Sequence, residues 1–165
     1  MVISPKLDDV FAMAEHIERN GARFYRETAE GKGIDPDVRQ MLLELAAMED
    51  DHEKLFAEMR AELAGRNTAE PAFREEGDAV SYLHAVTDIW LVGKKNESAA
   101  SAAAEKRKPL VDVLRTAIEL EKDSIMFYLG LKEMLAEGSD KGRVDDIIRE
   151  EMRHIVDLNR KLEAI

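Results

Sequence analysis

Apolar residues recur at alternate steps of three and four along four segments, and each series predicts an amphipathic helix with one buried face. The predicted helices span residues 5–30, 36–64, 109–137 and 140–164. Stretches rich in Gly, Pro or Asn separate them and favour turns. The second helix shows the pattern most clearly, and its predicted buried face reads Val38, Leu42, Leu45, Glu49, His52, Phe56, Met59 and Leu63.

Each of these buried faces contains titratable side chains where an apolar residue is expected. The second and fourth helices each carry a Glu-x-x-His motif, and the first and third helices each carry one acid. Residues three apart lie on one helix face, so each motif can direct a carboxylate and an imidazole to the same point. The six residues are Glu18, Glu49, His52, Glu121, Glu151 and His154.

The two halves of the chain repeat each other around these residues. Glu151 follows Glu49 by 102 residues, and the stretch Ile17–Tyr25 is similar to Leu120–Tyr128 at an offset of 103. Such a repeat predicts a duplicated helical hairpin, with one cluster of acids and one histidine from each half.

Burying four carboxylates and two imidazoles without compensation costs several kcal/mol for each charge. The predicted buried faces carry no Lys or Arg around these acids, so the positive charge has to come from elsewhere. Two divalent cations would balance four carboxylates, and carboxylate with imidazole suits Fe, Mn or Zn. The alternative is a buried hydrogen-bonded polar cluster without metal.

The composition fits one helical domain over residues 1–165, with 45% apolar and 36% charged residues. The formal charge of −11 argues against nucleic-acid binding, which requires clustered Lys and Arg. The absence of Cys excludes disulfides, thiolate metal sites and a four-cysteine iron centre. The amino terminus does not read as a signal sequence, and no apolar run approaches the ~18 residues of a membrane span, so a cytoplasmic location is expected.

The predicted fold is all-α: an antiparallel four-helix bundle with a long connection, residues 66–108, between the second and third helices. A short helix is expected within this connection. It contains His84 and Trp90, and a lone His of this kind, like His16 on the first helix, is more often a surface or packing residue than a metal ligand. Trp90 is expected to serve packing or a subunit contact.

The four acids and two Glu-x-x-His histidines on successive helices resemble the di-iron carboxylate proteins of the ferritin-like superfamily. The stretches Ile17–Tyr25 and Ala117–Tyr128 are similar to the rubrerythrin branch, and the resemblance covers most of the chain outside residues 66–108. It implies two metal ions, most often iron, and an oxidoreductase acting on peroxide or dioxygen.

The resemblance also implies roles for individual residues. Glu18 with His52 would serve one metal, and Glu121 with His154 the other. The bridging carboxylates would be Glu49 and Glu151. Two tyrosines would flank the site and hydrogen-bond a ligand carboxylate from across the bundle, and these are Tyr25 and Tyr128.

The chain departs from the rubrerythrin pattern in two ways. It has no Cys for a rubredoxin domain, so an external electron donor is required. It also has Ser124 where rubrerythrins carry an additional acid, with Gly21 at the matching place on the first helix. Iron oxidation for storage, and a metal-binding module without turnover, remain alternatives. A homo-oligomer is expected, with a dimer favoured. A dimer would disfavour storage, which requires a shell-forming oligomer.

Overall fold

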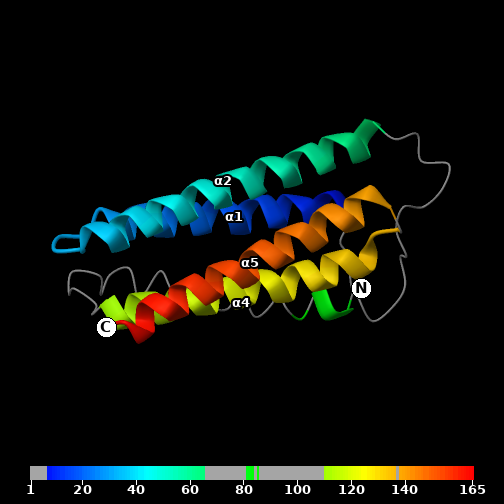
Figure 1. Cartoon of the computed structure of the whole chain (residues 1–165). Coiled ribbons are helices and arrows are strands. Elements are labelled where there is room, and N and C mark those ends of the chain that lie inside the picture. Colours follow the sequence, from blue (N-terminus) through cyan, green and yellow to red (C-terminus); the bar gives the residue numbers. More distant parts are fainter. Residues whose placement is uncertain (1–6, 66–80, 84, 86–109, 137) are drawn as a thin grey trace.

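The computed structural model describes residues 7–65, 81–83, 85, 110–136 and 138–165. Its long helices are α1 (Leu7–Ala29), α2 (Pro36–Gly65), α4 (Leu110–Met134) and α5 (Ser139–Glu163). Helices α1 and α2 form one hairpin, α4 and α5 form a second, and the two hairpins pack lengthwise (Figure 1). Helix α2 ends and α4 begins at opposite ends of the bundle (Figure 1). The predicted all-α bundle with a long second connection is confirmed.

The turn between α1 and α2 follows from three residues. Gly33 has a φ of 80°, a left-handed conformation that glycine adopts without strain. Asp35 then caps α2, because its Oδ1 accepts hydrogen bonds from the backbone N–H groups of Asp37 at 3.0 Å and Val38 at 3.4 Å. Pro36 is the first helical residue, where its missing N–H is not needed.

The buried faces form two separate apolar clusters, one toward each end of the bundle. The first contains Phe11, Phe56 and Tyr128 among others. The second contains Tyr25 and Leu42 among others. On every long helix the predicted ligand positions fall between the residues of these two clusters, so they form a buried polar layer with apolar packing on both sides.

A short piece of the connection is also placed. Residues 81–83 and 85 are helical, and Leu83 is buried in the first apolar cluster. Tyr82 donates a hydrogen bond from its hydroxyl to the backbone oxygen of Met126 at 2.7 Å, which ties the segment to α4. His84 and Trp90 lie outside the described residues, so their predicted packing roles stay predictions.

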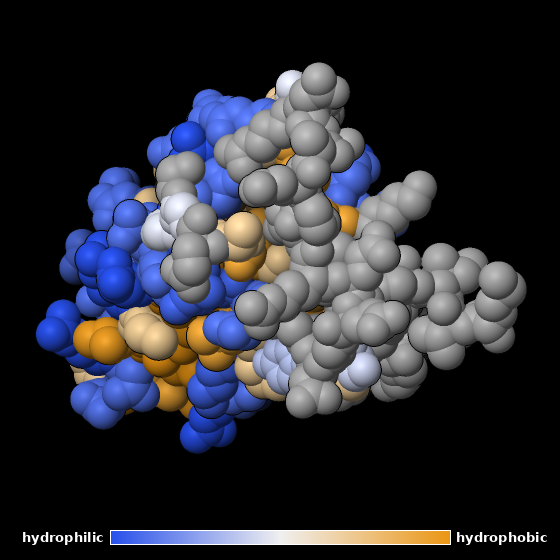
Figure 2. Space-filling view, turned by 90° about the vertical axis from the view of Figure 1, so that its right-hand side faces the viewer, coloured by the Kyte–Doolittle hydropathy of each residue, from blue (hydrophilic) through white to orange (hydrophobic). Residues whose placement is uncertain are grey.

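Charged and polar residues cover most of the outer faces of the long helices, and a patch of exposed apolar side chains interrupts them on the face shown in Figure 2. As a result, none of the described helices has an apolar stretch of the length and purity needed to cross a membrane.

Candidate metal centre

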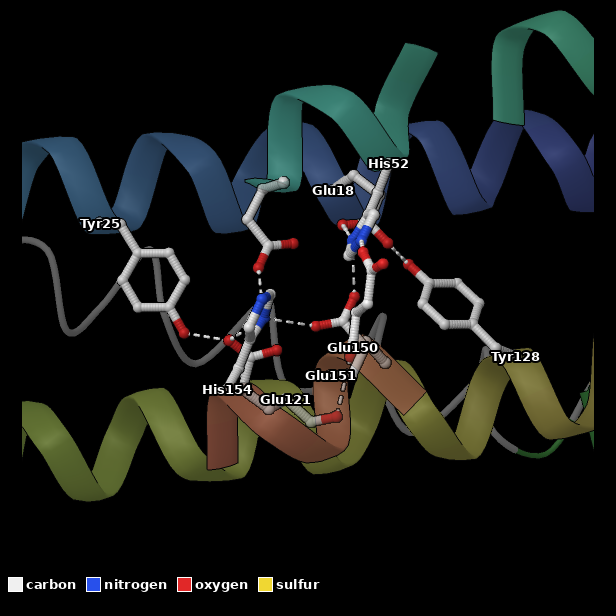
Figure 3. A network of polar contacts seen from close by, with 10 residues as sticks. Glu18, Tyr25, His52, Glu121, Tyr128, Glu150, Glu151 and His154 are labelled. Atoms are coloured by element: carbon white, nitrogen blue, oxygen red, sulfur yellow. Dashed lines mark hydrogen bonds and ion pairs between the residues drawn. The ribbon is translucent and has the colours of Figure 1, made fainter. Parts of the chain in front are cut away.

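The polar layer brings together all six residues that the sequence predicts as metal ligands (Figure 3). They form two groups, within each of which one potential ligand atom per residue lies within 4.8 Å of the others. The groups share two carboxylates. The first group is Glu18, Glu49, His52 and Glu151, and the second is Glu49, Glu121, Glu151 and His154.

Both imidazoles face this layer with Nδ1. His52 Nδ1 lies 2.9 Å from Glu151 Oε1 and 3.6 Å from Glu18 Oε2. His154 Nδ1 lies 2.8 Å from Glu151 Oε2, 3.4 Å from Glu49 Oε1 and 3.6 Å from Glu121 Oε1. Atoms that share an ion at about 2.1 Å are themselves about 3.0–3.4 Å apart. The spacing of the groups therefore suits one cation in each.

Hydrogen bonding within the described residues leaves much of this layer unsatisfied. One or more inward-facing atoms of Glu18, Glu49, His52, Glu151 and His154 are buried without a hydrogen-bond partner. Buried polar atoms are otherwise almost always paired, because each unpaired one costs about 1–3 kcal/mol. These atoms converge on common points and are all ligand types for Fe, Mn or Zn, so the residues fit a pair of such ions.

Two tyrosines hold carboxylates of the opposite hairpin. Tyr25 on α1 donates its hydroxyl hydrogen bond to Glu121 Oε1 on α4, and Tyr128 on α4 donates to Glu18 Oε1 on α1 (Figure 3). Burial, together with the charge of the accepting carboxylate, raises the pKa of both phenols well above its ordinary value. Both tyrosines therefore stay protonated and act as donors.

Without metal, protons balance the charge of the layer. Burial disfavours the imidazolium forms, but contacts with the carboxylates outweigh it and raise the pKa of His52 to about 11 and that of His154 to about 12. Burial also disfavours ionised Glu151, but the two imidazoles lower its pKa to about 2. Burial raises the pKa of Glu121 to about 8 and holds that of Glu49 well above its usual range. Cations would replace these protons.

Gly21 and Ser124, which occupy equivalent positions in the two halves of the repeat, have different surroundings. A Cβ at Gly21 would lie 3.3 Å from Glu49 Oε2, so glycine lets this shared carboxylate approach α1 closely. Ser124 is buried and donates its hydroxyl hydrogen bond to the backbone oxygen of Glu121 at 2.8 Å. That bond is made within its own helix.

One residue at the site was missed by the sequence interpretation. Glu150 Oε2 lies 2.7 Å from His52 Nε2, on the side of the ring away from the carboxylates (Figure 3). Glu150 is 44% exposed, and an exposed acid on an acidic helix has no distinctive sequence pattern. The internal repeat could have drawn attention to Glu150. The two halves differ at the residue before the Glu-x-x-His motif, which is Met48 in the first half and Glu150 in the second.

The other two histidines are predicted to be surface or packing residues rather than metal ligands. His16 is partly buried on α1 and belongs to neither ligand group. His84 is outside the described residues. Within the described part of the chain, only the two motif histidines enter the ligand groups.

Comparison with known proteins gives a consistent result. The sequence profile of the rubrerythrin family matches residues 9–162. A Thermotoga maritima crystal structure, described as that of a candidate ferritin-like diiron-carboxylate protein, is 27% identical in sequence with a TM-score of 0.69. The match covers 99% of this chain and 98% of that one. No curated protein matches the sequence at a significant level.

Proposed function

The chain belongs to the rubrerythrin family, and from this premise we propose that it is a di-iron oxidoreductase that reduces peroxide or dioxygen. The observation that carries the proposal is the pair of ligand groups that share Glu49 and Glu151. Two ions held by common carboxylates would be near enough to act together on one small molecule, as in known two-metal sites.

The proposed ligand roles follow from which residues belong to one group and which to both. Glu18 and His52 would hold one ion, and Glu121 and His154 the other. The carboxylates common to both groups would bridge the ions. When bound, two Fe²⁺ ions would supply the two electrons that the oxidant takes up.

The remaining residues would orient ligands and exclude water. Tyr25 and Tyr128 each donate to one oxygen of a terminal carboxylate. The other oxygen of Glu18 is buried without a hydrogen-bond partner among the described residues, which leaves it available to a cation. The two apolar clusters keep bulk water away on both sides of the layer and strengthen the electrostatic interactions inside it.

The overall reaction requires a supply of electrons. Reduction of one hydrogen peroxide to two water molecules consumes two electrons and two protons. The 165 residues contain no Cys, the residue that binds iron in a rubredoxin-type centre. We therefore propose a separate protein or small-molecule donor that reduces the centre after each turnover.

The test starts with the full chain purified without oxygen. Two metal ions per chain are expected after loading with Fe²⁺, followed by consumption of about one peroxide per pair of Fe²⁺ ions. Glu49→Ala should lower the metal content of both sites, because this carboxylate belongs to both groups. Stable binding of two ions with no consumption of peroxide or dioxygen would instead identify a metal-binding module without turnover.

Size measurement separates the remaining alternative. Iron storage requires a closed shell of many subunits, whereas a reductase can act as a dimer. A dimer that consumes peroxide supports the proposal, and a large shell that accumulates iron beyond two ions per chain contradicts it.

A further inference from the structure

The two halves of the candidate centre differ just outside the ligands. His52 Nε2 has Glu150 Oε2 at 2.7 Å. His154 Nε2 is buried and has no hydrogen-bond partner among the described residues. The internal repeat explains the difference, because the residue before Glu151 is Glu150 and the residue before Glu49 is Met48.

A carboxylate at the outer nitrogen of a ligating imidazole has two effects. It accepts the N–H bond, which fixes the tautomer with the inner nitrogen free to bind a cation, and it makes that nitrogen a stronger ligand. His52 has Nδ1 facing Glu151 and Glu18 and Nε2 facing Glu150, so both conditions are met. A thioether such as Met48 is only a weak acceptor and gives no comparable effect.

The surroundings of Glu150 favour this pairing. The neighbouring cation Arg149 is paired with Asp146 at 2.8 Å. The side chain of Glu150 is 44% exposed while that of His52 is 4% exposed. Glu150 is therefore partly solvated and contacts a buried imidazole ring. The contact therefore adds an anion near one metal position only.

We propose that Glu150 is a positioning residue that makes the Glu18–His52 position the tighter of two unequal metal sites. The inference rests on the dinuclear centre proposed above. It implies that the two sites fill in sequence, with the Glu121–His154 position filling last.

The test is a titration of the metal-free full chain with Co²⁺ against a competing chelator. The wild-type chain should bind two ions with different affinities. Glu150→Met, which copies the first half of the repeat, should weaken the tighter site about 10–100-fold and bring the two affinities together. Met48→Glu should tighten the weaker site, because it supplies the missing carboxylate to His154. Asp157→Asn removes a similar exposed charge from α5 and should change neither affinity.

A spectroscopic readout identifies which site responds. In the Zn²⁺-loaded protein, the Nε2–H resonance of His52 should move in Glu150→Met while that of His154 stays in place, and Met48→Glu should do the reverse. Circular dichroism of the metal-free variants checks that the helices are retained.

The outcomes separate this inference from the proposed function. Two bound ions whose affinities are unaffected, or equally weakened, by Glu150→Met would overturn the inference and leave the dinuclear centre standing. A wild-type chain that binds fewer than two Co²⁺ ions would overturn both.

Discussion

At the scale of single residues, Tyr25 and Tyr128 connect the hairpins at the points where charge is buried. Each hydroxyl donates to a carboxylate of the other hairpin, and each ring packs in one of the apolar clusters. The tyrosines therefore join the apolar clusters to the polar layer. Their hydrogen bonds to carboxylates across the bundle agree with the arrangement that the sequence resemblance implied.

Replacing Tyr128 by Phe should destabilise the metal-free protein by about 1–3 kcal/mol, because Glu18 Oε1 loses its donor in a fully buried position. Urea unfolding of the metal-free variant measures this loss. Tyr82→Phe is the control, since it removes a hydroxyl bond at a side chain that is 37% exposed. The explanation fails if Tyr82→Phe costs as much as Tyr128→Phe.

Metal binding should release protons and become tighter as pH rises. The pKa of His52 is raised from 6.5 to about 11, that of His154 from 6.5 to about 12 and that of Glu121 from 4.5 to about 8. All three groups hold protons at pH 7 that metal ligands must lose. Calorimetry in buffers of different ionisation enthalpy should show at least two protons released per pair of ions. Binding heats that do not depend on the buffer would contradict this prediction.

The same shifts set the stability of the metal-free fold. A raised pKa in the folded state contributes stability below the ordinary value and loses it as pH rises through the folded value, here about 8 for Glu121 and about 11 for His52. The lowered pKa of Glu151 has the opposite effect on the pH dependence of stability. Its contribution to stability is present above the ordinary pKa and disappears as pH falls through about 2. Both directions place the maximum stability of the metal-free protein in mildly acidic solution.

At the scale of elements, helix α4 packs against the described part of the connection at a glycine. A Cβ on Gly130 would lie 2.7 Å from Tyr82 Cδ1 and 2.8 Å from Leu83 Cδ2. Gly130 is buried, as is Leu83, so neither helix has free space at this contact. The absence of a side chain on α4 is what allows the segment to approach.

Replacing Gly130 by Ala should lower the free energy of unfolding by about 1–3 kcal/mol, because overpacking displaces the segment or strains α4. Gly142→Ala is a matched control in α5. A Cβ there meets nothing within 4 Å among the described residues, and alanine should stabilise the helix by up to about 1 kcal/mol. Thermal unfolding compares the two variants, and a Gly130→Ala protein as stable as Gly142→Ala would show that the contact is dispensable.

At the scale of the whole molecule, the polar layer is the place where the hairpins depend on each other. Each ligand group takes residues from both hairpins, since Glu151 joins the first group and Glu49 joins the second. Cations bound there would hold the hairpins together, and they would bind the folded state in preference to the unfolded chain.

Removal of metal should therefore lower the unfolding temperature. At a free-ion concentration about one hundred times the dissociation constant, one site contributes about 2.7 kcal/mol. For a domain of this size that corresponds to a shift of about 5–10 °C. Calorimetric scans with and without a chelator measure the shift. Glu49→Ala should abolish most of it, and an unchanged shift in this variant would mean that the ions act elsewhere.

The sequence predicted the bundle and the buried cluster of candidate ligands because polar residues such as Glu49 and His52 interrupt an otherwise apolar helix face. That signal requires a buried face. Glu150 was missed because it lies on a solvated helix face, where the sequence does not distinguish an acid that contacts the site from an ordinary surface acid. The contact of Tyr82 with α4 was missed because the connection has no long series of regularly spaced apolar residues. A glycine within a helix also does not indicate which neighbouring segment packs against it.

The sharing of carboxylates between hairpins bears on how the centre is made during synthesis. A nascent chain that has emerged as far as α2 presents Glu18, Glu49 and His52 but lacks Glu151, which belongs to the last helix. The carboxylate that completes the first group and links it to the second becomes available only after α5 has been synthesised. An intermediate that lacks α5 thus cannot assemble either ligand group in full, because each group includes Glu151.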